Sequence, residues 1–392
     1  MNILIASWTP RRREGGVAGV IWNLKDALEL HGHHVDCWFL EDILPSPVRP
    51  ARFESTVFAW RLARRVWRDR ARYDVVNLHA PTGFFYGLLR RTLWRSGPPY
   101  VMTMHGLEER RAHAMRREVR KSRAWHFGWK NRMWHRIHHL PQFSIAIRTA
   151  DQAIVLNREA WSYLQLGYGR DAADVSYIPN GVEERFFLPR EYPCAVTPRL
   201  LFAGSWLDHK GIFYLRDAMI ILAQRLPDVS LTIAGCSATE QTVRDFFPTE
   251  IQSCISVLPF VKASEMPALY AGHDIFVFPS LMEGLPLVLL EAMATGMPVV
   301  TTETCGMADV VQDGVNGLTV APADAEAVAE SIIRLAQSVD LRSQLGRTAQ
   351  NDMRRYTWDR IAERVQRVFI SAVQTQSHAQ GIAAHIEKEL RR

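Results

Sequence analysis

The sequence predicts an α/β protein of two domains, each built on a parallel sheet. Short apolar runs alternate with segments of helical periodicity along most of the chain, as expected for β-strands joined by helical crossovers. The alternation stops at 186–199, where three prolines and little periodicity indicate a linker. The chain has 392 residues, 47% apolar and 22% charged, which is enough for two or three packed cores.

Each expected strand is a short apolar run, as in strands that are buried on both faces. The first domain, at 1–190, is expected to hold strands at 2–7, 34–40, 74–79, 100–105 and 152–157. The second domain, at 191–355, is expected to hold strands at 199–205, 229–235, 255–260, 274–280, 297–302 and 317–321. A helix at 356–373 follows, which we expect to pack back on the first domain, and 374–392 should be a polar tail.

Positive charge is concentrated in the first half of the chain. Residues 1–190 hold 30 Lys and Arg against 18 Asp and Glu, whereas the remainder holds 17 against 23. The five cysteines lie far apart without metal-ligand spacing, and no apolar run approaches the ~18 residues of a membrane span. We therefore expect a cytoplasmic protein in a reducing compartment, without a disulfide framework or a signal peptide.

A short helix is expected at 286–295, because Pro286 suits its first turn and Gly296 its end. Glu283 lies just before this helix and Glu291 lies within it. The helix is apolar on every face, so the Glu291 carboxylate should be buried and should need donors, either ribose hydroxyls of a ligand or an internal arginine. Glu283 follows a strand at the edge where parallel sheets bind ligands, and the free N–H groups there favour a diphosphate. A simple helix cap is the alternative interpretation of Glu283.

Two further loops at strand ends hold candidate phosphate ligands. The loop at 204–212 presents Lys210, whose ammonium would neutralise a phosphate, although a solvated lysine would look the same in sequence. In the loop at 11–20, Gly15 and Gly16 would let the backbone approach a phosphate closely, and paired glycines are also common in flexible turns.

Four stretches together resemble the retaining nucleotide-sugar glycosyltransferases of family 4. They are EGLPLVLLE with its E-x7-E pair (283–291), the AGS…KG loop (203–211), IPNGV (178–182) and GMADVVQDGVNGLTV (306–320). The resemblance covers nearly the whole chain and is strongest from 178 to 338. It implies the GT-B fold, in which two Rossmann-like domains with parallel sheets face a cleft. The N-terminal domain would bind the acceptor, and the C-terminal domain the nucleotide sugar.

The resemblance also implies roles for residues of the second domain. Glu283 would contact the donor sugar, and Glu291 would hold the ribose. Lys210 would bind the diphosphate. The backbone N–H groups of Gly284 and Leu285 would reach the sugar or the phosphates.

In the first domain, the resemblance places Gly15 and Gly16 beside the donor phosphate and the acceptor, and His105 near the transferred sugar. One position departs from the family pattern. Members usually carry an arginine where this chain has Ser205. In this family that arginine and the residue matched by Lys210 form a pair of cations around the diphosphate, called the cationic clamp below. One of the two would be missing here unless His209 or an arginine of the first domain replaces it.

The implied activity is that of a retaining hexosyltransferase that moves a sugar from a UDP- or GDP-sugar to a hydroxyl of a saccharide or lipid-linked saccharide, in cell-envelope polysaccharide or glycolipid synthesis. No enzyme nucleophile is obvious, and we expect no cofactor, no obligatory metal and no nucleic-acid partner. Two alternatives stay open. One is a nucleotide-sugar epimerase or hydrolase of the same fold, and the other, motivated by Ser205, is a catalytically weak sugar-nucleotide-binding adaptor at a membrane surface.

An anionic membrane is a further candidate partner of the basic half. One helical face is predicted to carry Arg61, Arg64, Arg65, Arg68 and Arg72, near Trp60 and Trp67. Residues 101–150 add 11 basic against 3 acidic side chains, with tryptophans at 125, 129 and 134. Such segments can lie on anionic lipid, which would make the protein peripheral at the inner face of the membrane. A solvated face whose tryptophans enter the core is an equal alternative.

Overall fold

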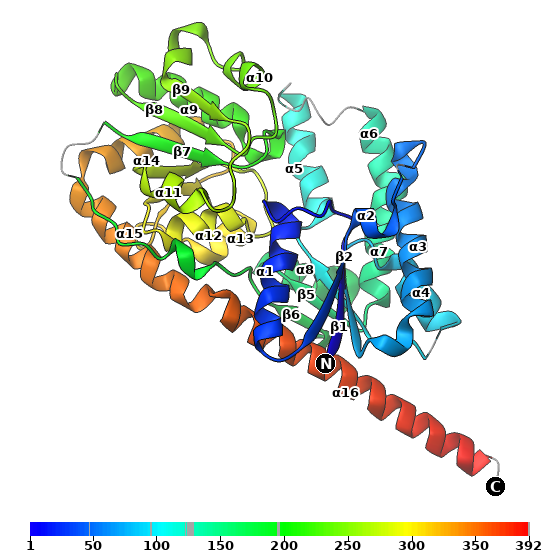
Figure 1. Ribbon diagram of the computed structural model, residues 1–392. Helices are drawn as coiled ribbons and strands as arrows, with labels where there is room; N and C mark the ends of the chain where they lie inside the picture. Colours follow the sequence, from blue (N-terminus) through cyan, green and yellow to red (C-terminus); the bar gives the residue numbers. More distant parts are fainter. Residues whose placement is uncertain (47, 95, 122, 124–128, 194–196, 391–392) are drawn as a thin grey trace.

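The computed structural model describes residues 1–46, 48–94, 96–121, 123, 129–193 and 197–390. Two lobes, each with a central sheet enclosed by helices, follow one another along the chain, and one long C-terminal helix runs beneath both (Figure 1). Six parallel strands form each sheet. The expected pair of parallel α/β domains is therefore confirmed.

The N-terminal sheet has the strand order β2-β1-β3-β4-β5-β6. Its strands are β1 (Asn2–Ala6), β2 (His34–Trp38), β3 (Val75–His79), β4 (Tyr100–Met104), β5 (Gln152–Val155) and β6 (Val175–Tyr177). Its helices are α1 (Gly16–Leu30), α2 (Leu40–Ile43), α3 (Glu54–Arg68), α4 (Phe84–Thr92), α5 (Glu108–Arg120), α6 (Trp129–Trp134), α7 (Leu140–Thr149) and α8 (Arg158–Tyr168).

The side chains of β1 show how this lobe is divided into layers. Ile3 and Ile5 point to the face covered by α1, whereas Leu4 and Ala6 point to the face covered by α3, α4 and α7. This is the alternation of period two that a strand imposes on its side chains. Both faces are apolar, which explains why the strands read as continuous apolar runs in the sequence.

The C-terminal sheet has the order β12-β11-β10-β7-β8-β9. Its strands are β7 (Arg199–Ala203), β8 (Ser230–Ala234), β9 (Ile255–Leu258), β10 (Ile275–Phe278), β11 (Val299–Thr302) and β12 (Leu318–Val320). Its helices are α9 (Ile212–Arg225), α10 (Glu240–Arg244), α11 (Met266–Ala271), α12 (Leu287–Ala294), α13 (Cys305–Val310), α14 (Ala325–Gln337) and α15 (Val339–Met353). In both sheets the strand order reverses once, between β1 and β3 and between β7 and β10.

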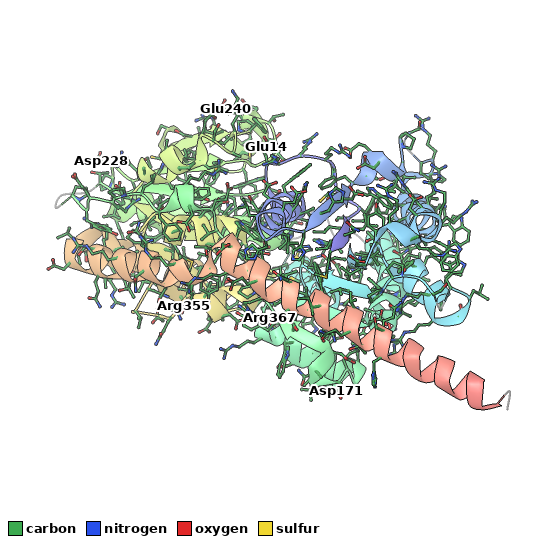
Figure 2. All side chains as sticks on the ribbon, turned by 60° about the horizontal axis from the view of Figure 1, so that its bottom comes forward. Glu14, Asp171, Asp228, Glu240, Arg355 and Arg367 are labelled. Carbon is green, nitrogen blue, oxygen red and sulfur yellow. The ribbon has the colours of Figure 1, made fainter. Side chains whose placement is uncertain are left out.

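Helix α16 (Trp358–Leu390) starts after the C-terminal lobe but contributes to the core of the N-terminal lobe. Trp358, Ile361, Val365 and Phe369 are buried there with the residues of β1 and α1. Figure 2 shows the helix crossing the molecule, with Arg367 among its charged side chains. The helix continues to Leu390, well past the end expected at 373, so most of the segment expected as a polar tail is helical.

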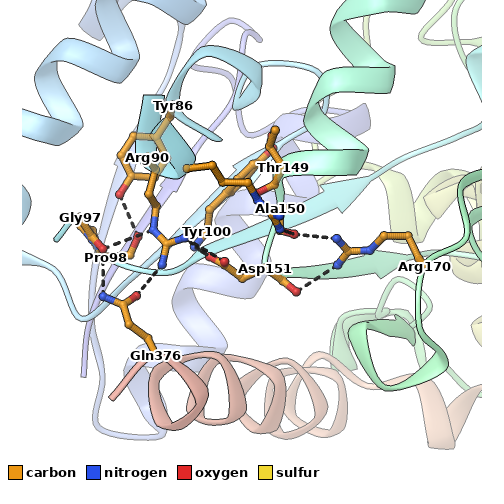
Figure 3. Close-up of polar contacts among 11 residues, drawn as sticks. Tyr86, Arg90, Gly97, Pro98, Tyr100, Thr149, Ala150, Asp151, Arg170 and Gln376 are labelled. Atoms are coloured by element: carbon orange, nitrogen blue, oxygen red, sulfur yellow. Dashed lines mark hydrogen bonds and ion pairs between the residues drawn. The ribbon is translucent and has the colours of Figure 1, made fainter. Parts of the chain in front are cut away.

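The first part of that extension is bonded to the N-terminal lobe (Figure 3). The Gln376 amide accepts from Arg90 (2.7 Å) and donates to the carbonyl of Gly97 (3.0 Å). Arg90 also pairs with Asp151 (2.8 Å), whose carboxylate accepts from the backbone of Tyr100 (2.7 Å). The extension is therefore anchored at Gln376 to α4 and to the loop before β4.

Candidate active site

A cavity of about 250 Å³ lies between the lobes at the carboxyl ends of the strands. Its walls come from the loops after β1 (Ser7 to Thr9) and β3 (Ala80 to Thr82), from the end of β4, and from the loop after β10 (Met282 to Gly284). The loops after β1, β3 and β10 lie at the points where the strand order reverses, and His209, from the loop after β7, joins them. Open parallel sheets bind ligands at such points because the neighbouring loops there diverge.

Glu283 enters this cavity together with the loop after β7. Its carboxylate forms an ion pair with Lys210, accepts from the Ser280 hydroxyl (3.4 Å) and lies 3.9 Å from the His209 ring. Burial lowers the pKa of His209 to about 4, so this ring is neutral near pH 7. Two of the predicted residues, Glu283 and Lys210, are thus brought together, whereas His209 adds no positive charge that could replace the missing arginine.

The turn that carries Glu283 is fixed by two asparagines from outside the C-terminal sheet. Asn157, the N-cap of α8, donates to the carbonyl of Gly284 (2.9 Å), and Asn180 donates to the carbonyl of Leu285 (2.7 Å). A Cβ at Gly284 would overlap the carbonyl oxygen of His105, so only glycine permits this approach of the two lobes. The asparagines were not identified from the sequence, although Asn180 belongs to the IPNGV stretch.

Glu291 lies on α12, outside the lining of this cavity. Its carboxylate accepts from the hydroxyl of Tyr270 (2.9 Å), a residue of α11. Among the described residues no arginine is within ion-pair distance of Glu291, which removes the alternative of an internal arginine partner. Burial raises the pKa of Glu291 to about 7, although the hydrogen bond from Tyr270 acts in the opposite direction.

His105 follows β4 and lines the cavity together with a second histidine, His79, at the end of β3. The two rings are joined by a hydrogen bond of 2.7 Å between His79 Nδ1 and His105 Nε2. Burial lowers the pKa of His105 to about 4 and that of His79 well below its ordinary value. Sequence analysis missed His79 because a single histidine at the end of a strand gives no sign of its neighbour on the next strand.

The remaining predicted residues lie around the cavity rather than in its lining. Gly15 and Gly16 have φ angles of 79° and 55° and open space at the Cβ position, and they start α1, whose Val17 does line the cavity. Ser205 follows β7 and is half-buried, and Leu285 is buried. Each of the two loops contributes a nearby residue to the lining, namely Val17 after the two glycines and His209 after Ser205.

A charged cluster that sequence analysis also missed forms part of the N-terminal wall. Glu108 and Arg111, both on α5, line the cavity and are 3.2 Å apart, and His135 lies 2.9 Å from Glu108. Burial would raise the pKa of Glu108, but the hydrogen bond from His135 and the charge of Arg111 outweigh it and lower that pKa. Among the described residues of the N-terminal lobe, Arg111 is the arginine that lines the cavity.

The predicted arginine face on α3 is divided by the structure. Arg61, Arg64 and Arg68 are exposed beside the half-exposed Trp60, and Arg72 is exposed after the helix. Arg65 instead folds over the ring of Trp38 and donates to a backbone carbonyl. Of the tryptophans in the second basic segment, Trp129 is exposed and Trp125 lies outside the described residues.

Comparison with known proteins agrees with this architecture. Residues 14–186 match the family model described as Glycosyltransferase Family 4, and residues 197–338 match the model described as Glycosyl transferases group 1. The chain belongs to glycosyltransferase family 4. The two models fall on the two lobes, and this glycosyltransferase carries its E-x7-E pair, Glu283 and Glu291, within the second.

Relatives of this glycosyltransferase extend over most of its length. An uncharacterised glycosyltransferase of Methanocaldococcus jannaschii is 25% identical over 95% of this chain and 99% of its own. The D-inositol 3-phosphate glycosyltransferase of Pseudarthrobacter chlorophenolicus is 29% identical over 81% of this chain and 75% of its own.

Solved structures show the same fold. Sucrose-phosphate synthase of Thermosynechococcus elongatus has a TM-score of 0.75 at 19% identity, over 95% of this chain and 99% of its own. HepE of Anabaena, in complex with UDP and glucose, has a TM-score of 0.68 at 18% identity, over 94% and 99%. The expectation of the GT-B fold is confirmed.

The described residues contain neither a metal-binding cluster nor a membrane-spanning helix. No group of three or more His, Cys, Asp and Glu side chains that could hold a metal ion occurs among them. In the same part of the chain, no helix combines the length and the apolar composition that crossing a bilayer requires. The absence of an obligatory metal or cofactor stays a prediction.

Proposed function

We propose that this glycosyltransferase moves a sugar from a UDP- or GDP-sugar to a hydroxyl of a saccharide acceptor, with retention at the anomeric carbon. The observation that carries the proposal is the ion pair between Lys210 and Glu283, whose side chain lines a cavity where the reversal points of both sheets meet. HepE, which has the same fold, was crystallised with UDP-glucose. The donor would lie against the C-terminal lobe and the acceptor against the N-terminal lobe.

Charge separation in the transition state gives each group its role. As the glycosidic bond of the donor breaks, positive charge develops on the sugar ring and negative charge on the leaving diphosphate. Lys210 and the backbone N–H groups before α12 would stabilise the diphosphate. Glu283 would hold the sugar, and Glu291 would accept from the ribose hydroxyls while Tyr270 orients its carboxylate. We propose attack by the acceptor on the face that the leaving group vacates, which needs no enzyme nucleophile.

Arg111 is our candidate for the second cation of the diphosphate site, in place of the arginine that Ser205 replaces. It lines the cavity, its guanidinium offers several N–H donors to a phosphate, and its present partner Glu108 is itself shared with His135. Arg111 also belongs to the N-terminal lobe, whose α5 contacts the C-terminal lobe through a hydrogen bond of 2.7 Å between Tyr214 and Glu118. The clamp would thus be completed from the opposite side of the cleft.

The acceptor is proposed to be a cell-envelope saccharide or glycolipid, processed at the inner face of the membrane. The relatives include D-inositol 3-phosphate glycosyltransferases and, over 45% of this chain, the amylovoran biosynthesis glycosyltransferase of Erwinia amylovora. The exposed residues Trp60, Arg61, Arg64 and Arg68 would provide the contact with anionic lipid.

The experiment is a donor panel of UDP-glucose, UDP-galactose, UDP-N-acetylglucosamine and GDP-mannose, with and without saccharide and lipid-linked acceptors. Release of UDP or GDP that depends on the acceptor, together with an α-linked product from an α-linked donor, supports the proposal. Release without an acceptor, or a changed sugar on the nucleotide, would indicate a hydrolase or an epimerase instead. Tight nucleotide binding without any turnover would indicate the adaptor.

A further inference from the structure

A short polar chain of Asn77, His79 and His105 leads from the interior of the N-terminal sheet to the cavity. Asn77 and His79 lie on β3, and His105 directly follows β4. Asn77 is fully buried and His79 is 1% exposed, so both are held rigidly by the core. Buried polar groups of this kind are satisfied in a definite pattern of donors and acceptors.

The orientation of the Asn77 side-chain amide determines which ring nitrogen of His79 carries a proton. Its nitrogen donates to the carbonyl of Val101 (3.1 Å) and to the hydroxyl of Thr103 (2.8 Å). The amide oxygen therefore faces His79 Nε2, at 3.2 Å. Because an amide oxygen can only accept, His79 must carry a proton on Nε2.

Because His79 is neutral, its second ring nitrogen determines which nitrogen of His105 carries a proton. Burial, and then the neighbouring His105, lower the pKa of His79 well below its ordinary value. A neutral imidazole with its proton on Nε2 has an unprotonated Nδ1, which accepts. His105 Nε2, 2.7 Å from that Nδ1, must consequently donate.

The consequence for the cavity lies at the other nitrogen of His105. Burial lowers the pKa of His105 to about 4, so its Nδ1 carries a lone pair at neutral pH. In the described part of the chain this Nδ1 has no hydrogen-bond partner. The ring lines the cavity beside the turn of Glu283 and Gly284, where the transferred sugar is proposed to bind.

We propose that Asn77 and His79 are positioning residues that hold His105 as its Nε2–H tautomer, so that His105 Nδ1 accepts a hydrogen bond from a hydroxyl of the transferred sugar. The inference rests on the proposed function and deepens it. The site would select a sugar with a free hydroxyl at the contacting carbon, and it would disfavour a donor that is deoxygenated or O-substituted there. A site built to bond a hydroxyl discriminates strongly against an analogue that lacks it.

The tautomer can be measured without any substrate. In the full-length protein labelled with ¹⁵N-histidine, two-bond ¹⁵N–¹H correlation spectra distinguish protonated from unprotonated ring nitrogens, and a His105→Gln variant assigns the signals. We expect a protonated Nε2 and an unprotonated Nδ1 for both His79 and His105. A proton on Nδ1 of His105, or exchange between the two tautomers, would overturn the proposal whatever the activity of the enzyme.

The kinetic test compares two substitutions at His79. His79→Asn keeps an acceptor near the position of Nδ1, whereas His79→Leu removes it, and His113→Leu on the exposed side of α5 is the control. With the donor identified by the panel, we expect His79→Leu to lower kcat/KM about tenfold or more and His79→Asn to retain most of it. For the deoxy form of that donor that lacks the contacting hydroxyl, kcat/KM should be the same in His79→Leu and in the wild type, because it has no hydrogen bond to His105 to lose.

Two results would contradict this expectation. If His79→Leu lowers kcat/KM equally for the donor and for all of its deoxy forms, His79 has only a structural role. If His79→Asn is as impaired as His79→Leu while both variants melt like the wild type, the acceptor at position 79 does not matter. If the panel shows no turnover at all, the proposed function fails, and the NMR result still decides the tautomer.

Discussion

At the scale of single residues, Glu283 lines the cavity and forms an ion pair with Lys210, so each side chain neutralises the charge of the other. A diphosphate that binds Lys210 must compete with this carboxylate. Lys210 should therefore stabilise the transition state, in which negative charge develops on the leaving diphosphate, more than it stabilises the bound donor.

Lys210→Ala is therefore expected to lower kcat by tenfold or more and to change donor affinity less. Steady-state kinetics and calorimetric titration with the donor measure the two effects separately. Lys262→Ala, which removes an exposed lysine of the same lobe, is the control and should have little effect. An unchanged kcat in Lys210→Ala would exclude the proposed role.

Glu291→Gln is expected to weaken donor binding by ~1–3 kcal/mol while the fold is retained, because an amide accepts from ribose hydroxyls less strongly than a carboxylate. Calorimetric titration with UDP and with GDP measures the loss. Tyr270→Phe, which removes the hydroxyl that orients this carboxylate, should show a smaller loss of the same kind. Normal nucleotide binding by a folded Glu291→Gln protein would leave Glu291 with a structural role alone.

The pH dependence of Glu291 follows from its pKa, which burial raises from 4.5 to about 7. The folded state holds this proton more tightly than the unfolded state, so its contribution to the free energy of unfolding is present below about 4.5 and is lost as pH rises through about 7. Relative to Glu291→Gln, the wild type should thus lose stability between pH 5 and pH 8 and gain donor affinity. Urea unfolding and nucleotide titration of both proteins at these two pH values test the signs.

At the scale of elements, α16 joins the lobes because its apolar face packs on the N-terminal sheet. Phe369 is fully buried in that core, whereas Arg367 is exposed on the same helix. Phe369→Ala should lower the free energy of unfolding of the N-terminal lobe by ~3–5 kcal/mol, and Arg367→Ala should change it little. Calorimetry that resolves the transitions of the two lobes measures both, and equal melting curves would show that α16 does not stabilise the N-terminal lobe.

Sequence reasoning identified the strands that are continuous apolar runs, because burial on both faces leaves that mark. It missed β6, since Val175–Tyr177 is only three residues long and two of its three residues are half-buried. It ended the last helix at 373 because the apolar period weakens there, whereas the helix continues with Gln376 bonded to the N-terminal lobe.

Within the site, sequence motifs identified residues but not their partners. Glu283 and Lys210 could be expected together because both follow strands that share one edge of a sheet. The donor to Glu291 is Tyr270, which lies 21 positions away on another helix, and the partner of His105 is a histidine on the neighbouring strand. Such pairs depend on side-chain packing across elements, which leaves no periodicity or spacing in the sequence.

At the scale of the whole molecule, the excess of positive charge lies in the lobe proposed to bind the acceptor. The N-terminal lobe should bring the protein to vesicles containing phosphatidylserine, and added salt should release it, with each basic side chain near the surface contributing ~1 kcal/mol. Co-sedimentation of the wild type and of a variant with Arg61, Arg64 and Arg68 changed to Gln tests this contact. A variant with the exposed residues Arg225, Arg334 and Arg347 of the other lobe changed to Gln is the matched control.

Only weaker pelleting of the first variant supports the membrane contact. Equal pelleting of the wild type and both variants would show that the arginines of α3 form a solvated face. No pelleting of any of them would favour a soluble acceptor.

The path of α16 has a consequence for synthesis on the ribosome. The N-terminal lobe is translated first, but the helix that closes one face of its sheet is encoded after the entire C-terminal lobe. At the usual ~5–20 residues per second, the nascent N-terminal lobe would wait about ten seconds or more with Val75, Val101 and Ile154, the residues of β3, β4 and β5 on that face, not yet covered by α16. During this interval its apolar surface would be open to chaperones, and only release of the finished chain would let the last helix complete the first domain.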